Sequence, residues 1–315
     1  MIYEKGKRMF SYNKNTKESR VYINLPPEIK YNFEFLNDIT GLIKIIEDSG
    51  CDAVLFSYNE KNAKLNKMGA AYLYTLMRFF SQRKKVYVNQ WLLNLIRKKV
   101  SHKNGKKFEK IELKEIITNP TLQCYSYDSD TNVTHTVEMI VEFITEKSLV
   151  FENVKEFLIT TIGEVFSNAF YHGNENLVHF MYDIEKQKEN YHLVINITDY
   201  GKTIIGNVQD YLNESLDHKE CMKWAMQSGN TTREGSGGYG LPTLIDYVKQ
   251  INGELLIFSS DCIYALKGNA ENILYSKGMF SGTSFSMKIP LFDTSKIISY
   301  DEKKHEIISI SLDEI

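Results

Sequence analysis

Hydrophobic positions in the first hundred residues switch between the strand period and the helix period. Apolar runs at 21–25, 52–58 and 85–88 have the length of buried strands. Residues 35–46 and 69–83 place apolar side chains at three- and four-residue spacings, the pattern of an amphipathic helix. The alternation of strands and helices predicts a small α/β domain with a largely parallel sheet.

The pattern weakens after Lys99. Residues 101–107 are polar and basic, as expected of an exposed loop, and residues 125–132 (YSYDSDTN) contain many turn formers and no apolar period. The 315 residues are enough for two domains with separate cores. We therefore expect one domain at 1–125, a second at 126–300 and a C-terminal extension at 301–315.

The second half of the chain combines helical and strand patterns. Helices are expected at 133–145, 151–171 and 241–251, the last ending at Asn252-Gly253. Alternating strands are expected at 178–184, 192–198, 254–259 and 284–289, with Pro290 beyond the last one. Helices followed by antiparallel strands predict an α/β two-layer sandwich.

Composition and charge limit the classes of protein to which the chain can belong. With 43% hydrophobic and 25% charged residues, the chain has the balance of a globular protein. A net charge of −2 favours neither nucleic acid nor an anionic membrane as a partner, and no apolar run approaches the roughly 18 residues of a membrane helix. Four separated cysteines without a C-x-x-C pair indicate neither a zinc site nor a redox pair and suit a reducing cytoplasm.

Polar residues recur on the helix expected at 151–171. Glu164, Asn168 and His172 are four residues apart and so lie along one stripe of it. A carboxylate and an amide one turn apart can hold a water and a divalent cation between them. The simpler interpretation is an exposed helix face, but Asn is a poor interior helix former and the apolar flanks indicate packing on more than one side.

Two further motifs have chemistry of their own. Asp199 ends a strand and precedes Tyr200-Gly201, so it could accept a hydrogen bond from the exocyclic amine of a base, although plain turns share this pattern. The Gly-rich run Gly235–Gly240 precedes an apolar helix, where backbone N–H groups and the helix dipole favour an anion. It matches neither the Walker A pattern nor the dinucleotide fingerprint.

In this order the motifs resemble those of the GHKL superfamily of Bergerat-fold (HATPase_c) ATPases and kinases. EVFSNAFYHG is similar to its N-box, DYG to its first glycine box, GSGGYGLPTL to its second, and GTSFSMKIP (Gly282–Pro290) to its terminal strand motif. The resemblance covers roughly 132–292 and implies a site for ATP and Mg²⁺. It departs from the family where Lys202-Thr203-Ile204 follows Gly201, because the usual second glycine is missing.

The resemblance also implies roles for individual residues. Asn168 would bind Mg²⁺, Glu164 would act catalytically by polarising water or a substrate hydroxyl, and Asp199 would read adenine. A lid at 206–233 could bring Lys223 or Arg233 to phosphate oxygens. The other nucleotide-binding positions implied are His172, Gly201, Gly235, Gly237, Gly238, Tyr239, Gly240, Leu241 and Thr283.

The first domain more weakly resembles a STAS domain of the anti-sigma-antagonist type, over CDAVLFSYNEKNAKLNKMGAAYLYTLMRFFSQRKKVYVN. In that family a Ser or Thr just before the loop glycine is phosphorylated, whereas Met68 precedes Gly69 here, so a docking or scaffold domain is expected. His135 lacks the surroundings of a histidine-kinase phosphoacceptor, which disfavours a two-component sensor.

Together these resemblances favour an Mg-ATP-binding regulatory protein of the anti-sigma serine-kinase-like branch. Its lid would control binding of an as yet unidentified protein partner, with possible phosphotransfer to Ser or Thr. Two alternatives stay open: a slow ATPase clamp that forms a homodimer on ATP binding, and a pseudoenzyme that only binds nucleotide.

Overall fold

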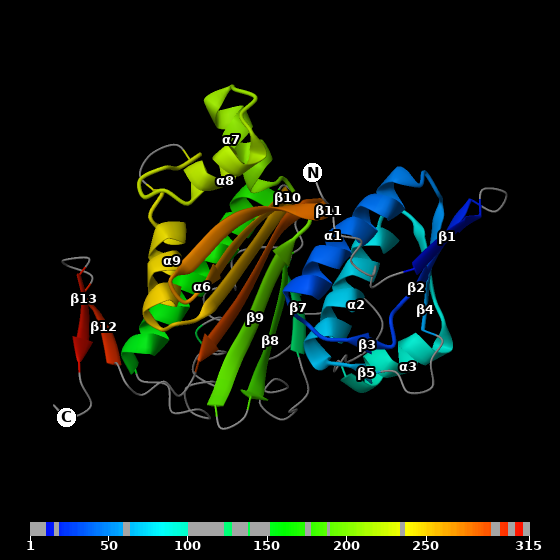
Figure 1. Cartoon of the computed structure of the whole chain (residues 1–315), viewed down its shortest axis with the longest axis horizontal. Helices are drawn as coiled ribbons and strands as arrows, with labels where there is room; N and C mark the ends of the chain where they lie inside the picture. Colours follow the sequence, from blue (N-terminus) through cyan, green and yellow to red (C-terminus); the bar gives the residue numbers. More distant parts are fainter. Residues whose placement is uncertain are drawn as a thin grey trace. The chain divides into compact units, whose positions relative to one another are not determined.

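The chain is a mixed α/β protein with several sheets (Figure 1). The computed structural model describes residues 11–15, 19–58, 64–99, 123–127, 138, 152–173, 178–187, 190–233, 237–290, 297–301 and 306–310. Within these ranges no helix is both long and apolar enough to cross a bilayer. The expected helix at 133–145, except residue 138, and the expected loop at 101–107 lie outside the described residues.

The first of two compact units is built on a four-stranded sheet in the order β1-β2-β4-β6. These strands are β1 (Ser11–Asn15), β2 (Arg20–Asn24), β4 (Ala53–Ser57) and β6 (Lys85–Val88). The β2, β4 and β6 strands run parallel, as predicted, and β1 pairs antiparallel with β2. Its helices are α1 (Phe33–Asp48), α2 (Lys67–Ser81) and α3 (Gln90–Lys99), and β3 (Glu28–Ile29) pairs with β5 (Lys64–Leu65).

Local sequence explains where the first two helices begin. The Asn32 side chain accepts a hydrogen bond from the Phe35 backbone N–H at 2.9 Å, and Asn66 accepts one from Gly69 at 2.8 Å. Both are N-caps, which satisfy backbone donors that a helix start leaves unpaired. Gly69 therefore lies in the first turn of α2.

The second unit contains a five-stranded sheet in the order β10-β11-β9-β8-β7. Its strands are β7 (Gln123–Tyr127), β8 (Val178–Gln187), β9 (Asn190–Asp199), β10 (Glu254–Lys267) and β11 (Ala270–Pro290). Strand β9 pairs antiparallel with both β8 and β11. Helices α6 (Glu152–Gly173), α7 (Ile204–Leu212), α8 (His218–Ala225) and α9 (Gly240–Gln250) complete it, with a separate hairpin of β12 (Ile297–Asp301) and β13 (Glu306–Ile310).

Two expectations about where strands begin and end were wrong. Residues 125–127 belong to β7 and not to a turn, since tyrosine favours strands and alternates with smaller residues there. Strands β10 and β11 extend far beyond 254–259 and 284–289, and Pro290 is the last residue of β11. The Tyr275–Phe280 part of β11 groups with the first unit, where the Lys277 N–H donates to Asn37 Oδ1 at 2.8 Å.

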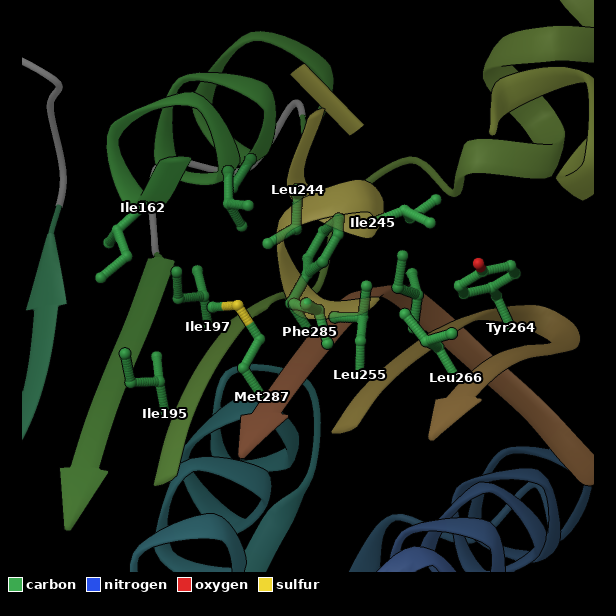
Figure 2. Close-up of a cluster of buried hydrophobic side chains, with 14 of the residues drawn as sticks. Ile162, Ile195, Ile197, Leu244, Ile245, Leu255, Tyr264, Leu266, Phe285 and Met287 are labelled. Atoms are coloured by element: carbon green, nitrogen blue, oxygen red, sulfur yellow. The ribbon is translucent and has the colours of Figure 1, made fainter. Parts of the chain in front are cut away.

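Apolar side chains between helices and sheet form the core of the second unit (Figure 2). Ile162 comes from α6, and Leu244 and Ile245 from α9. They lie over the sheet residues Ile195, Ile197, Leu255, Phe285 and Met287. Burying these side chains is the main source of stability expected for such a layer arrangement.

A buried polar network fixes the register of β9 and β11. Asn196 Nδ2 donates to Ser284 Oγ at 3.0 Å and to the Phe285 carbonyl at 2.9 Å, and Thr198 Oγ1 donates to Asn196 Oδ1 at 2.7 Å. A one-residue slip would turn every side chain of a strand to the opposite face. The network therefore holds Ile197 opposite Phe285 and, two residues further along β9, Asp199 opposite Thr283.

Candidate functional site

A cavity of about 390 Å³ lies in the second unit. Its walls come from α6, α7, α8, the segment after α8, the first turn of α9, the end of β9 and an inner part of β11. This volume is within the usual range for small-molecule pockets. The residues singled out in the sequence that line it are Glu164, Asn168, Asp199, Arg233, Gly237, Gly238, Tyr239, Gly240, Leu241 and Thr283.

Helix α6 supplies the carboxylate and the amide of the first motif. Its apolar side chains, among them Ile162 and Phe166, are buried in the core, while Glu164 and Asn168 line the cavity. Glu164 is exposed and Asn168 is half-buried. A Cβ atom built on Gly240 would lie 3.1 Å from Glu164 Oε2, so the start of α9 passes close to this carboxylate. Two residues of the polar stripe, Glu164 and Asn168, thus border a cavity.

Asp199 and Thr283 form a cross-strand pair of β9 and β11, beyond the apolar pair Ile197 and Phe285. Asp199 is only 3% exposed, and its Oδ1 accepts a hydrogen bond from the Gly201 N–H at 3.0 Å. Gly201 itself does not line the cavity, so its contact supports the carboxylate and does not widen the space for a ligand. A buried, anchored carboxylate at a cavity wall is a strong hydrogen-bond acceptor.

Gly282 allows the backbone of β11 to approach Asp199 closely. Its φ of +124° is one that other residues rarely adopt. A Cβ atom at this position would lie 2.2 Å from the Asp199 carbonyl oxygen. The glycine that opens the GTSFSMKIP motif is therefore required for β11 to pass beside Asp199.

The N-terminus of α9 faces the cavity without a side-chain cap. Its N-cap, Tyr239, makes no capping hydrogen bond, whereas Thr203 caps α7 and Asp217 caps α8. Gly238, with φ of +85°, accepts a hydrogen bond from the Gly229 N–H at 3.0 Å, which ties the loop to the segment after α8. A helix start with backbone donors at a cavity suits an anion.

Two basic side chains also line the cavity. Lys202 forms an ion pair with Asp210. Arg233 Nη2 donates to Asn168 Oδ1 at 2.6 Å and to Ser167 Oγ at 3.3 Å. Of the two lid cations expected near phosphate, Arg233 is thus at the cavity, whereas Lys223 is not among its lining residues.

Some lining residues were missed at the sequence level. Trp224 on α8 lines the cavity and packs against Tyr211, with ring centroids 5.8 Å apart. Lys202 directly follows Gly201, and only its place beside the DYG motif could have drawn attention to it. Gly235 and the side chain of His172 lie outside the described residues, so their predicted roles stay predictions.

The donor set limits how a metal could bind. In the part of the chain that the structure describes, no group of three or more His, Cys, Asp or Glu side chains is arranged to hold a metal ion. A cation at Asn168 would therefore take most of its ligands from water and a bound anion, as Mg²⁺ commonly does. No protein-family model matches the chain, and a search of curated proteins found no match either.

Proposed function

We propose that the second unit binds Mg-ATP in this cavity and that the protein is a nucleotide-dependent regulator of the GHKL type. One observation supports this most: three motifs far apart in sequence line a single cavity. Each motif alone has a simple structural explanation. Their convergence gives the cavity a buried carboxylate, an uncapped helix N-terminus and a carboxylate–amide pair, which match a base, phosphates and a divalent cation respectively.

The nucleotide would lie with its base at the end of β9 and its phosphates at α9. Asp199, supported by the Gly201 N–H, would accept a hydrogen bond from the exocyclic amine of adenine, with Thr283 opposite it. The first turn of α9 would bind phosphate oxygens through backbone N–H groups. Asn168 would bind Mg²⁺ together with phosphate and water oxygens.

The finer fold assignment belongs to the same proposal. A Bergerat-type sandwich is supported by α6 and α9 packing on one face of the five-stranded sheet. A STAS-like fold for the first unit is supported by its parallel β2, β4 and β6 strands with intervening helices. The first unit would then dock a protein partner.

The reaction is a second question. Glu164, one turn from Asn168 and exposed at the cavity, is positioned to accept the proton of an attacking hydroxyl or water. Single-turnover incubation with γ-labelled ATP separates the three functions. We expect protein-bound label from a serine/threonine kinase, free phosphate from an ATPase clamp, and neither from a pseudoenzyme; the kinase-like outcome is the one proposed.

The binding proposal is tested by Asn168→Ala, which removes the proposed metal ligand while introducing a better helix former. Calorimetric titration with Mg-ATP should show at least about a tenfold loss of affinity. Asn94→Ala is the matched control, because Asn94 is an exposed helical residue on α3 in the other unit. It should bind like wild type. Unchanged Mg-ATP affinity in Asn168→Ala would remove the metal assignment.

A further inference from the structure

The Arg233 guanidinium is hydrogen-bonded to the same Asn168 oxygen to which the metal is proposed to bind. Its Nη2 donates to Asn168 Oδ1 at 2.6 Å and to Ser167 Oγ at 3.3 Å. Its central carbon lies 4.7 Å from the centre of the Tyr171 ring, in cation–π geometry. Three neighbouring residues on one stretch of α6 therefore hold the guanidinium at Asn168.

From this geometry, and resting on the proposed Mg-ATP site, we infer that Arg233 is a built-in cation that Mg²⁺ must displace from Asn168. It thereby determines how strongly nucleotide binding depends on Mg²⁺. Without metal, Arg233 supplies positive charge at the phosphate end of the cavity. With metal, its contact with Asn168 is broken.

The charges explain why both cations do not share this position. Arginine does not lose its proton in proteins, so the guanidinium at Asn168 is always positive. Mg²⁺ binds oxygen at about 2.0–2.1 Å and requires near-octahedral space around it. A divalent ion and a guanidinium on one half-buried amide oxygen repel each other and compete for the same space.

A linkage follows from this competition. In wild type, the charge of Arg233 strengthens the binding of metal-free nucleotide. Binding of Mg-nucleotide must break the contact between Arg233 and Asn168. Adding Mg²⁺ therefore increases the nucleotide affinity of wild type only a little. Without the guanidinium, metal-free binding weakens and the metal meets no competitor, so the gain from Mg²⁺ grows.

The test measures ATP affinity by calorimetry on the full chain, once in excess EDTA and once in excess Mg²⁺. The readout is the ratio of the two dissociation constants, metal-free over Mg²⁺. Arg233→Gln should raise this ratio at least about tenfold, the scale of one charged hydrogen bond. Arg233→Lys keeps the charge and should stay nearer to wild type, and it covers the case in which Arg233→Gln is unstable.

Lys202→Gln is the matched control, since it removes one positive charge from the same cavity wall, and the partner of the Lys202 ammonium is Asp210. It should shift both affinities together and leave the ratio unchanged. A ratio that is unchanged in Arg233→Gln, or that rises equally in Lys202→Gln, would overturn the displacement and leave the Mg-ATP site standing. Absence of ATP binding to wild type under both conditions would overturn the proposed function and this inference with it.

Discussion

Replacing Asp199 with asparagine separates recognition of the base from recognition of the phosphates. The asparagine amide oxygen can keep the hydrogen bond from the Gly201 N–H, which is 3.0 Å long in the native protein. Its NH₂ group then takes the place of the second carboxylate oxygen and presents donors toward the proposed adenine amine, which is itself a donor. The variant should fold normally but lose its specificity for adenine.

The expected size of the effect follows from the burial of Asp199. Because this side chain is 3% exposed, water does not readily replace a lost hydrogen bond. A hydrogen bond to a charged group contributes about 1.5–3 kcal/mol, which is roughly a ten- to hundredfold change in affinity. Asp199→Asn should therefore weaken ATP by that factor.

Calorimetry with ATP and with tripolyphosphate on the same preparations measures this effect, and thermal unfolding checks the fold. Tripolyphosphate has no base, so its affinity should change by no more than about twofold. The variant should also gain preference for inosine triphosphate, whose base carbonyl can accept from the new NH₂ group. Equal losses for ATP and tripolyphosphate would refute the assignment of Asp199 to the base.

Three other substitutions test the site and its support. Gly282→Ala should destabilise the protein by about 2 kcal/mol or more in chemical unfolding, because its Cβ meets the backbone of Asp199, whereas Gly229→Ala, with φ of +87° and nothing within 4 Å, should lose only about 1 kcal/mol. Glu164→Gln should keep ATP affinity within a few-fold while lowering hydrolysis or transfer by about 10²–10⁴-fold; equal turnover would remove its catalytic role. Asn196→Ala should lose about 1–3 kcal/mol of stability by leaving buried network partners unsatisfied, and an unchanged unfolding midpoint would contradict that.

Much of the fold was predictable because its helices and strands have strong apolar periods. On α6, buried Leu158, Ile162 and Phe166 recur at helical spacing, and on β9 buried Ile195 and Ile197 alternate. Strand ends were less predictable. Strands β10 and β11 continue through polar residues, such as Ser259–Asp261 and Ser276–Lys277, where pairing within the sheet outweighs local pattern.

The candidate site was predictable only in part. Glu164, Asn168, Asp199 and the glycine loop could be chosen because each belongs to a motif with its own chemistry. Trp224 and the guanidinium contact of Arg233 could not, because they depend on how α8 and the following segment fold back over α6. Such contacts between distant segments leave no periodic signal in the sequence.

Fluorescence of Trp224 tests the central proposal most directly, since this residue lines the cavity. The chain contains two tryptophans, and Trp91→Phe removes the other, which lies on α3 in the first unit. Titration of this variant with Mg-ATP should change Trp224 emission saturably, with the midpoint given by calorimetry. Calorimetric binding without any change in Trp224 emission would locate the nucleotide elsewhere, and no binding by either method would contradict the Mg-ATP site altogether.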